Sequence, residues 1–273
     1  MEISLDRFPD GKQKALTMSY DDGIYDDIKL VEIFNKYGIK GTFHVNGGLM
    51  GDSSWSRLTR EEVAQVYQGH EISGHGYKHQ RLSNLPDTAI ISEIIKDRES
   101  LEPIIGKPLR GMSYPMGDTN ERVKHVLRGL DVAYSRVAET SGSFEVPEDF
   151  LEWKGTCHHN DRLIDRGEEF ISMPLYHQTK MLLMYVWGHS YEFSNDGNWG
   201  MIEEFCKKMS GNEEIWYATN MEICEYIQAV RALKFTANQD IVQNPSAINV
   251  WISVDQQPVE IKSGKVLQLS NLR

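Results

Sequence analysis

The sequence predicts an α/β protein, a closed or distorted (β/α) barrel that ends in a small antiparallel β appendage. Three observations favour this fold. Short apolar runs alternate with longer segments of helical period, which is the order typical of a parallel sheet with helices outside it. About seven such units over roughly 230 residues suit a barrel better than an open sheet. In the last forty or so residues the helical period disappears and only strand-like runs remain.

The first half of the chain alternates regularly between strands and helices. A strand at 14–19 is closed by Asp-Asp-Gly, and a helix at 26–37 stops at Gly38, a residue suited to a helix C-cap. Thr59 followed by Glu62 resembles a capping box that opens a helix reaching about residue 68. The other elements predicted in this half are strands at 41–45, 71–73, 109–114 and 131–135 and helices at 86–101 and 120–130.

The second half of the chain is less regular. Residues 138–174 show little periodicity, and we expect them to form a long excursion over one face of the barrel. The clearest buried strand is 182–187. It is followed by a helix at 199–209, a strand at 214–218 and a helix at 221–233. We therefore expect a barrel over 1–230 and a β appendage over 231–273, with a hairpin that begins at Val250 and a third strand at 265–269.

Composition limits the partners of this chain of 273 residues. Its 29 basic and 40 acidic residues give a net charge of −11, which disfavours binding to nucleic acid and, more weakly, to anionic membranes. No apolar run reaches the length of a membrane span, and the first residues have no apolar signal core. Three cysteines without C-x-x-C spacing disfavour a disulfide framework. We expect a cytoplasmic protein, or a secreted one if a leader has been removed.

Four polar clusters follow predicted strands and mark the candidate active site, because the carboxyl ends of barrel strands open on one face. Asp21-Asp22-Gly is, taken alone, typical of a turn. His75 and His79 have a spacing that lets two imidazoles bind one divalent ion, with Asp22 available as an acidic third ligand. The other two clusters are Tyr114-Pro-Met-Gly and His189, and a lone histidine after a buried strand is more often structural than catalytic.

The run Cys157-His158-His159-Asn160-Asp161 is a second candidate cluster. Adjacent histidines point apart in an extended chain, so they rarely share one ion. We expect this run to be a structural or substrate-facing segment.

In order and spacing, the first four clusters resemble those of polysaccharide deacetylases with the NodB homology domain, which form carbohydrate esterase family 4. The resemblance covers roughly residues 14–230. Thr17-Met-Ser-Tyr-Asp-Asp-Gly resembles the T-F-D-D-G motif of that family, and the segment from His75 to His79 resembles its H-[ST]-x-x-H motif. Val186-Trp-Gly-His resembles its late L-x-H motif, and the turn at 114–117 stands where the family has an R-x-P-Y-G loop.

The resemblance implies a distorted (β/α)7 barrel and the metal-dependent hydrolysis of an N-acetyl amide, usually on an amino sugar. Zn²⁺ suits an Asp-His-His set of ligands, with Co²⁺, Ni²⁺ and Mn²⁺ as alternatives. The implied roles are general base for Asp21, metal ligand for Asp22, His75 and His79, general acid for His189, and oxyanion or substrate contacts for Tyr114, Trp187 and Met116, the last through a backbone N–H.

Two positions depart from the family pattern. Gly76 stands where the family has Ser or Thr, and Ser113 stands where it has an arginine that orients the catalytic aspartate. Arg110 lies three residues before that position, and the sequence leaves open whether its side chain reaches the same place.

The leading hypothesis is therefore a metal-dependent carbohydrate deacetylase. One alternative is a hydrolase of the same barrel that acts on a non-sugar C–N bond or on an acetyl ester such as acetylated xylan. Another is a non-catalytic carbohydrate-binding protein. The expected partner is a carbohydrate or an N-acylated small molecule. We expect the β tail to be a structural cap, with an interaction surface, a lid or a homo-oligomer interface as the alternatives.

Overall fold

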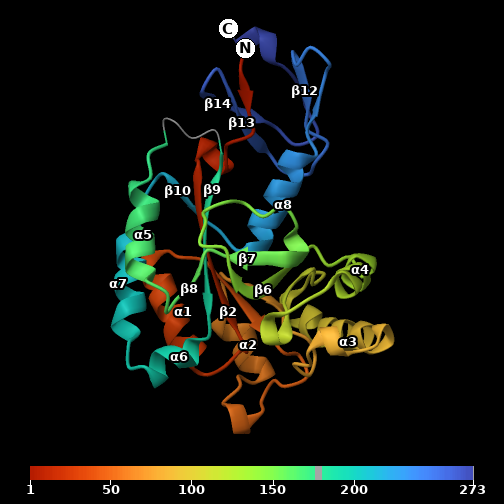
Figure 1. The fold of residues 1–273 in the computed structure, drawn as a ribbon, viewed down its shortest axis with the longest axis vertical. Helices are drawn as coiled ribbons and strands as arrows, with labels where there is room; N and C mark the ends of the chain where they lie inside the picture. Colours follow the sequence, from red (N-terminus) through yellow and green to blue (C-terminus); the bar gives the residue numbers. More distant parts are fainter. Residues whose placement is uncertain (176–179, 273) are drawn as a thin grey trace.

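A nine-stranded parallel sheet forms the centre of the computed structural model, which describes residues 1–175 and 180–272 (Figure 1). Its path runs β7-β6-β5-β4-β3-β2-β9-β8, and β10 pairs with β2 beside this path. The strands are β2 (Lys14–Asp21), β3 (Gly41–Val45), β4 (Glu71–Gly74), β5 (Gly111–Ser113), β6 (Tyr134–Thr140), β7 (Trp153–Gly155), β8 (Cys157–His158), β9 (Leu182–Gly188) and β10 (Ile215–Tyr217).

The sheet closes on itself through β7 and β8. These two short strands are consecutive pieces of chain separated only by Thr156, and β7 pairs with β6 while β8 pairs with β9. Between them the Thr156 backbone N–H donates to the Tyr185 carbonyl oxygen at 2.7 Å. Counting β7 and β8 as one position, the ring has seven positions besides β10. The expected distorted (β/α)7 barrel is thus confirmed.

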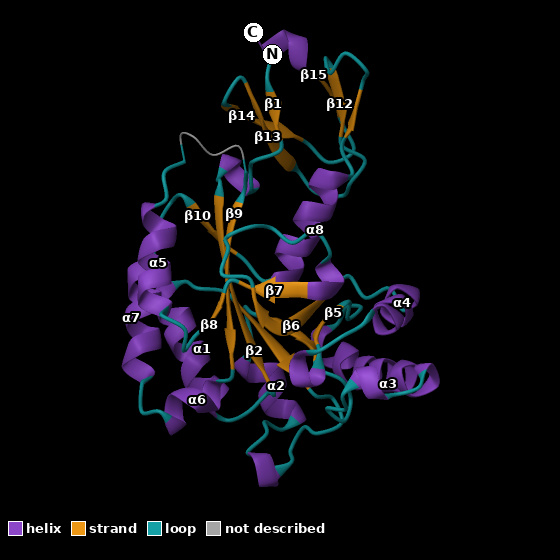
Figure 2. Ribbon diagram, in the orientation of Figure 1, coloured by secondary structure: helices purple, strands orange, loops and turns teal. Residues whose placement is uncertain are grey.

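Helices cover the outside of this barrel (Figure 2). The capping box expected at Thr59 is present, because its hydroxyl accepts from the Glu62 N–H at 3.2 Å and the Glu62 carboxylate accepts from the Thr59 N–H at 2.8 Å. Gly38 ends the first helix with a φ of 66°, as a C-cap glycine does. The helices are α1 (Asp26–Tyr37), α2 (Arg60–Val66), α3 (Asp87–Ile105), α4 (Glu121–Gly129), α5 (Leu163–Ser172), α6 (Ser190–Asn195), α7 (Trp199–Met209) and α8 (Asn220–Arg231).

The expectation of a long excursion over 138–174 is wrong. This stretch contains β7, β8 and α5, and it completes the barrel. Strands of two or three residues are too short to display an alternating pattern, which is why periodicity does not find them. The helix α5 packs on the barrel through the fully buried Phe170, whose ring centroid lies 5.1 Å from that of Phe144.

The β appendage consists of two small antiparallel sheets, β1-β13-β14 and β11-β12-β15. The predicted hairpin is present as β13 (Val250–Val254) and β14 (Gln257–Ile261). The predicted third strand, β15 (Val266–Gln268), pairs instead with β12 (Ile241–Gln243), which pairs in turn with β11 (Lys234–Phe235). The N-terminal strand β1 (Ile3–Ser4), which we expected with the barrel, pairs with β13.

The appendage packs at the amino end of the barrel strands. The Arg7 guanidinium donates to Ser253 Oγ at 2.7 Å, and the Tyr226 hydroxyl of α8 donates to the Arg7 carbonyl oxygen at 2.8 Å. Figure 1 shows β2 starting near this appendage and running away from it. The carboxyl ends of the strands therefore lie at the opposite end of the barrel, clear of the appendage.

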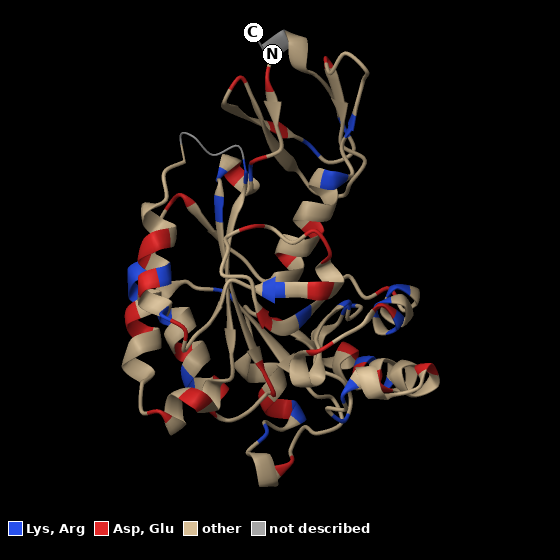
Figure 3. Cartoon of the chain, in the orientation of Figure 1, with Lys and Arg blue, Asp and Glu red and all other residues tan. Residues whose placement is uncertain are grey.

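Acidic and basic residues intersperse along the outer helices (Figure 3). Several of them form exposed ion pairs, such as Lys36 with Glu203 at 2.6 Å, and pairs of this kind contribute little to stability. Within 1–175 and 180–272, no helix has both the length and the apolar character needed to cross a bilayer.

Asp27 joins three parts of the fold near the carboxyl ends of the strands. This fully buried residue of α1 accepts hydrogen bonds from the Tyr67 hydroxyl at 2.6 Å, from Ser190 Oγ at 2.6 Å and from the Ile24 N–H at 3.2 Å. Burial raises the pKa of Asp27 to about 7, and these hydrogen bonds offset only part of the effect. The carboxyl group is thus easier to protonate in the folded protein than in the unfolded chain.

This shift predicts a pH-dependent effect of Asp27→Asn. The pKa of Asp27 rises from 3.8 to about 7 on folding, so its contribution to stability is present at low pH and is lost as pH rises through about 7. The variant cannot ionise, so its stability relative to the wild type should rise between about pH 4 and pH 7 and level off above that. Urea unfolding across that range measures the difference. Glu32→Gln, which removes an exposed carboxylate of α1, is the control, and a difference for Asp27→Asn that stays flat would contradict the prediction.

Candidate active site

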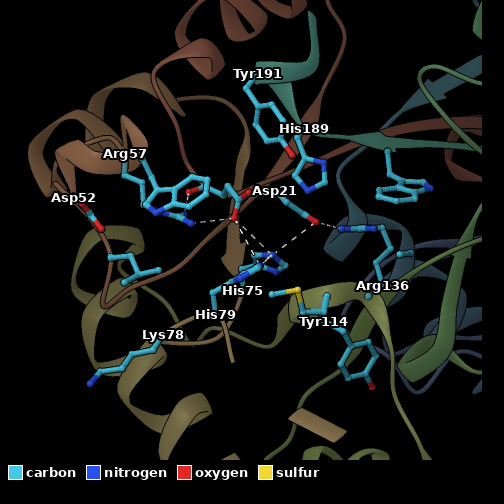
Figure 4. A pocket seen from close by; sticks show the side chains of 17 residues that line it. Asp21, Asp52, Arg57, His75, Lys78, His79, Tyr114, Arg136, His189 and Tyr191 are labelled. Carbon is cyan, nitrogen blue, oxygen red and sulfur yellow. Dashed lines mark hydrogen bonds and ion pairs between the residues drawn. The ribbon is translucent and has the colours of Figure 1, made fainter. Parts of the chain in front are cut away.

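The structure brings all eight predicted site residues together around one cavity of about 600 Å³ at the carboxyl ends of the barrel strands (Figure 4). They come from segments far apart in the sequence, at the ends of β2, β4, β5 and β9. The eight are Asp21, Asp22, His75, His79, Tyr114, Met116, Trp187 and His189.

Asp22, His75 and His79 form a compact group of candidate metal ligands. Asp22 Oδ1 lies 3.9 Å from Nε2 of each histidine, and the two Nε2 atoms are 3.1 Å apart. A tetrahedral zinc ion with bonds of about 2.1 Å separates its ligand atoms by about 3.4 Å. The three side chains are therefore arranged to take one ion with only small adjustments.

The hydrogen bonds of His75 prepare it for this role. Its Nδ1 lies 3.0 Å from the Ser113 carbonyl oxygen and 2.7 Å from Ser113 Oγ. Because a carbonyl oxygen only accepts, we assign the ring proton to Nδ1, which leaves the lone pair of Nε2 facing Asp22 and His79. A neutral imidazole held in this tautomer is the form that binds a divalent metal ion.

The histidine loop is braced by residues that the sequence did not single out. The Asn46 side-chain amide donates to the carbonyl oxygens of His75 and Gly76 at 2.5 and 2.8 Å. The buried Asp97 carboxylate of α3 accepts from the His75 N–H at 3.1 Å. Gly76 has a φ of 73°, and a Cβ there would lie 3.0 Å from Pro115 Cγ. Hydrogen bonds from Asn46 and to Asp97 thus brace the loop in place of the missing Ser or Thr. Glycine suits position 76 because the backbone there is left-handed.

Arg57 links this loop to Asp22. Asp22 has a φ of 85°, a left-handed conformation that is uncommon for a residue other than glycine. The Arg57 guanidinium donates to the Asp22 carbonyl oxygen and, at 3.3 Å, to its carboxylate, and it also donates to Asn46 Oδ1 at 2.8 Å. Arg57 and Asn46 therefore hold the two ligand-bearing loops in fixed relation.

Asp21 forms a buried ion pair with Arg136. The Arg136 guanidinium of β6 donates to Asp21 Oδ2, and Ser113 Oγ donates to Asp21 Oδ1 at 2.9 Å. Arg136 is the register partner of Ser113 on the neighbouring strand, so the expected arginine comes from one strand further along the sheet. Arg110 does not reach this place, because it pairs with Asp131 at 2.9 Å and does not line the cavity.

The ion pair keeps Asp21 ionised. Burial alone would raise the pKa of Asp21, but Arg136 and, to a smaller extent, His75 hold it well below its usual range. The Arg136 guanidinium also stacks on Trp187, with Cζ 4.4 Å from the ring centroid. Trp187 therefore helps to fix the direction in which Arg136 meets Asp21.

His189 lies beside the Glu192 carboxylate at the start of α6. Glu192 Oε2 accepts from the His189 backbone N–H at 3.0 Å and lies 3.6 Å from His189 Nδ1. Burial would lower the pKa of His189, but Glu192 and, more weakly, Asp21 and Asp22 outweigh this effect and raise it. The protonated imidazole is thereby favoured.

The run Cys157–Asp161 supports the same carboxylate. Nε2 of His158 lies 3.2 Å and Nε2 of His159 lies 3.1 Å from Glu192 Oε2. His158, His189 and Glu192 are close enough to hold an ion, but His158 Nδ1 accepts from the Asn160 N–H at 3.2 Å. The ring proton of His158 therefore sits on Nε2 and points at Glu192, which fits hydrogen bonding rather than metal binding.

Tyr114 and Met116 lie at the turn after β5. The Tyr114 hydroxyl donates to the Leu151 carbonyl oxygen at 2.7 Å, so this group is engaged within the fold. Met116 has a φ of 63° in the turn between Pro115 and Gly117, and its side chain lines the cavity.

Two of the residues missed by sequence reasoning carry a signal in the sequence. Arg136 is the one charged residue within the apolar run 132–138, where a buried strand arginine needs a partner. Glu192 stands three residues after His189, the spacing of a capping box. Nothing in the local sequence distinguishes Arg57, Asn46 or Asp97, because their partners are distant in the chain.

Comparison with known proteins agrees with these features. Residues 9–135 match the family model described as polysaccharide deacetylase. A chitin deacetylase of Arthroderma benhamiae is 37% identical over 93 residues, which are 33% of this chain and 24% of that protein. A chitin deacetylase of Pestalotiopsis is 29% identical over 119 residues, 42% of this chain and 39% of that protein. The aligned part of the chain thus spans a quarter to two fifths of these relatives.

Solved structures share the fold. A candidate polysaccharide deacetylase from Mycobacterium smegmatis superposes with a TM-score of 0.60 at 17% identity, over 84% of this chain and 96% of that one. A pseudoenzyme of carbohydrate esterase family 4 from Bacillus anthracis gives a TM-score of 0.50 at 14% identity, over 80% of this chain and 66% of that one. At these identities the matches support the fold alone.

The buried pair predicts a strong and non-additive effect of Arg136→Met. Removing the arginine leaves Asp21 as an unpaired buried carboxylate, which should lower the free energy of unfolding by about 3–5 kcal/mol. The double variant Asp21→Asn/Arg136→Met should recover part of this loss, because it removes the uncompensated charge. Urea denaturation of the metal-free proteins measures both effects. Losses that simply add in the double variant would show that the two side chains do not interact.

Proposed function

We propose that this protein is a metal-dependent hydrolase that removes N-acetyl groups from a carbohydrate, because residues 9–135 match the family model described as polysaccharide deacetylase. The observation that carries this proposal is the convergence of three functions on one cavity: an ionised carboxylate at Asp21, a set of metal-ligand atoms, and a histidine that favours its protonated form. Each has a role in metal-assisted hydrolysis of an amide.

Asp22, His75 and His79 would hold the metal ion, since their oxygen and nitrogen donors suit Zn²⁺ and the tautomer of His75 leaves its Nε2 free to bind. When bound, such an ion supplies Lewis acidity, which polarises an acetyl carbonyl and lowers the pKa of a bound water toward about 7. Three protein ligands leave coordination positions open, as a catalytic site needs.

Asp21 would act as the general base. It faces the ligand group, with Oδ2 3.9 Å from His75 Nε2, and can accept a proton from a water held there. Arg136 keeps it in the ionised form that accepts a proton, and Ser113 fixes its orientation. The departure at Ser113 is therefore compatible with catalysis.

His189 would act as the general acid that protonates the leaving group. Its Nδ1 faces Glu192, so Nε2 is the atom available to donate a proton to the leaving amine. Glu192 favours the charged imidazolium before the transfer and orients the ring, as the third group of a catalytic triad does. A backbone N–H near Met116 would help to hold the negative charge that develops on the carbonyl oxygen.

The two alternative functions differ in what they require. A hydrolase of the same barrel acting on a non-sugar C–N bond or an acetyl ester would use the same groups, and only a comparison of substrates separates it. A non-catalytic carbohydrate-binding protein would not need the Asp21–Arg136 pair or the Glu192–His189 pair. The presence of both pairs favours an enzyme over a pseudoenzyme.

The ligand assignment predicts one tight site for Zn²⁺. Isothermal titration of metal-stripped protein should give about one equivalent, and His79→Gln should weaken binding at least about tenfold by removing one ligand atom. His125→Gln, which changes an exposed histidine of α4, should bind zinc as the wild type does. Unchanged affinity in His79→Gln would place the ion elsewhere.

The base assignment predicts a loss of catalysis without loss of metal. Asp21→Asn should lower kcat for acetate release by at least about 100-fold, the usual contribution of a general base, while zinc still binds. Release would be measured from acetylated chito-oligosaccharides, acetylated xylan and small N-acetyl amides, with the exposed Asp10→Asn as control. Full activity of Asp21→Asn would rule out its role, and no release by zinc-loaded wild type from any of these substrates would contradict the proposed function.

A further inference from the structure

The Ser113 hydroxyl lies between the candidate base and one of the candidate metal ligands. Its Oγ is 2.9 Å from Asp21 Oδ1 and 2.7 Å from His75 Nδ1. Ser113 ends β5, is fully buried, and does not line the cavity. Because the hydroxyl is not exposed to a substrate in the cavity, any effect that it has on the reaction acts through Asp21 and His75.

The hydrogen bonds of this hydroxyl have a fixed direction. The Asp21 carboxylate accepts from the Arg136 guanidinium at Oδ2, and an ionised carboxylate has no proton to donate at Oδ1. The single hydroxyl proton of Ser113 therefore points to Asp21. This leaves an oxygen lone pair of Ser113 to accept the Nδ1 proton of His75. The Ser113 carbonyl oxygen, 3.0 Å from the same Nδ1, independently requires that tautomer.

A continuous chain of hydrogen bonds thus runs from Arg136 through Asp21 and Ser113 to His75. It ends at His75 Nε2, whose lone pair is free and which lies 3.9 Å from Asp22 Oδ1. Figure 4 shows Asp21 between Arg136 and the two histidines of the site. All four side chains of the chain are buried, so water does not compete for these hydrogen bonds, and each bond polarises the next.

The register of the sheet makes this chain possible. Ser113 and Arg136 are register partners on adjacent parallel strands, and such strands lie about 4.8 Å apart. A short hydroxyl from one strand and a long guanidinium from the next therefore reach the two oxygens of one carboxylate. An arginine side chain at position 113 would only donate, so it could not accept from His75 Nδ1. The serine adds a link to the metal ligand that an arginine in its place would not make.

We propose that Ser113 is a positioning residue that couples the candidate base to the candidate metal site. Its one hydroxyl holds Asp21 Oδ1 and, at the same time, holds His75 with Nε2 turned toward Asp22 and His79. Because such coupling is reciprocal, binding of a metal ion at His75 also stabilises the orientation of Asp21. This inference rests on the proposed function, because it assigns a role within the same base and ligand set.

Zinc affinity, measured by isothermal titration of metal-stripped protein, tests this role without turnover. Ser113→Ala should weaken zinc binding about tenfold, the usual loss when a group that supports a histidine ligand is removed. Ser113→Thr, which keeps the hydroxyl, should bind zinc within about threefold of the wild type. Ser253→Ala is the matched control, because it removes a buried hydroxyl of the appendage that also donates to a carboxylate, that of Asp6 at 2.6 Å.

A double-mutant cycle with Asp21→Asn tests the coupling itself. In Asp21→Asn the amide oxygen faces Arg136, which only donates, so the amide NH2 faces Ser113 Oγ and the hydroxyl proton loses its acceptor. Asp21→Asn should therefore weaken zinc binding at least about threefold more in the wild-type background than in Ser113→Ala. If Ser113→Ala does not fold, Ser113→Cys, whose thiol is a weak donor and acceptor, takes its place in the cycle.

The outcomes separate this inference from the proposed function. Losses that simply add, zinc binding unchanged by Ser113→Ala, or a loss that is equally large in Ser113→Thr would overturn the role of the hydroxyl and leave the proposed function standing. A coupled cycle in a protein that releases no acetate would support that role and count against the proposed function alone. A wild type that binds no zinc would overturn both.

Discussion

The buried ion pair between Asp21 and Arg136 is the interaction on which the rest of the site depends. The two side chains are only 4% and 1% exposed, and a carboxylate buried to this degree is strongly unfavourable without a partner. Asp21 ends β2 and Arg136 lies on β6, strands that are not neighbours in the sheet. The pair therefore joins two strands that lie across the barrel from each other.

The candidate catalytic groups form two sets around this pair. Asp21 and Ser113 face the histidine whose Nε2 is available for metal, and Arg57 and Asn46 hold the ligand-bearing loops from behind. In the second set, Glu192 lies beside His189 and is contacted by His158 and His159. Both carboxylates, Asp21 and Asp22, and the Nδ1 of His75 thus have partners within the fold, which hold them in place before substrate arrives.

The sequence predicted most of the fold and the eight lining residues, but not their supports. Most strands and helices of regular period were predicted near their observed bounds, although the strand expected at 131–135 lies at 134–140. The candidate metal ligands follow from spacing and resemblance. The closing strand at β7 and β8 was missed because its two pieces are too short to alternate. Arg136 and Arg57 were missed because their partners, Asp21 and Asp22, are far away in sequence. Only the register of β5 on β6, which pairs Ser113 with Arg136, shows that an arginine lies beside Ser113 and within reach of Asp21.

The most direct test of this account is a crystal structure of the zinc-loaded protein with anomalous diffraction at the zinc edge. We expect one strong peak within bonding distance of Asp22 Oδ1 and of Nε2 of His75 and His79. In the same structure Arg136 should remain paired with Asp21, and Glu192 should remain beside His189. A main peak between His158, His189 and Glu192, or an Arg136 side chain turned away from Asp21, would contradict the assignment of base, acid and metal ligands.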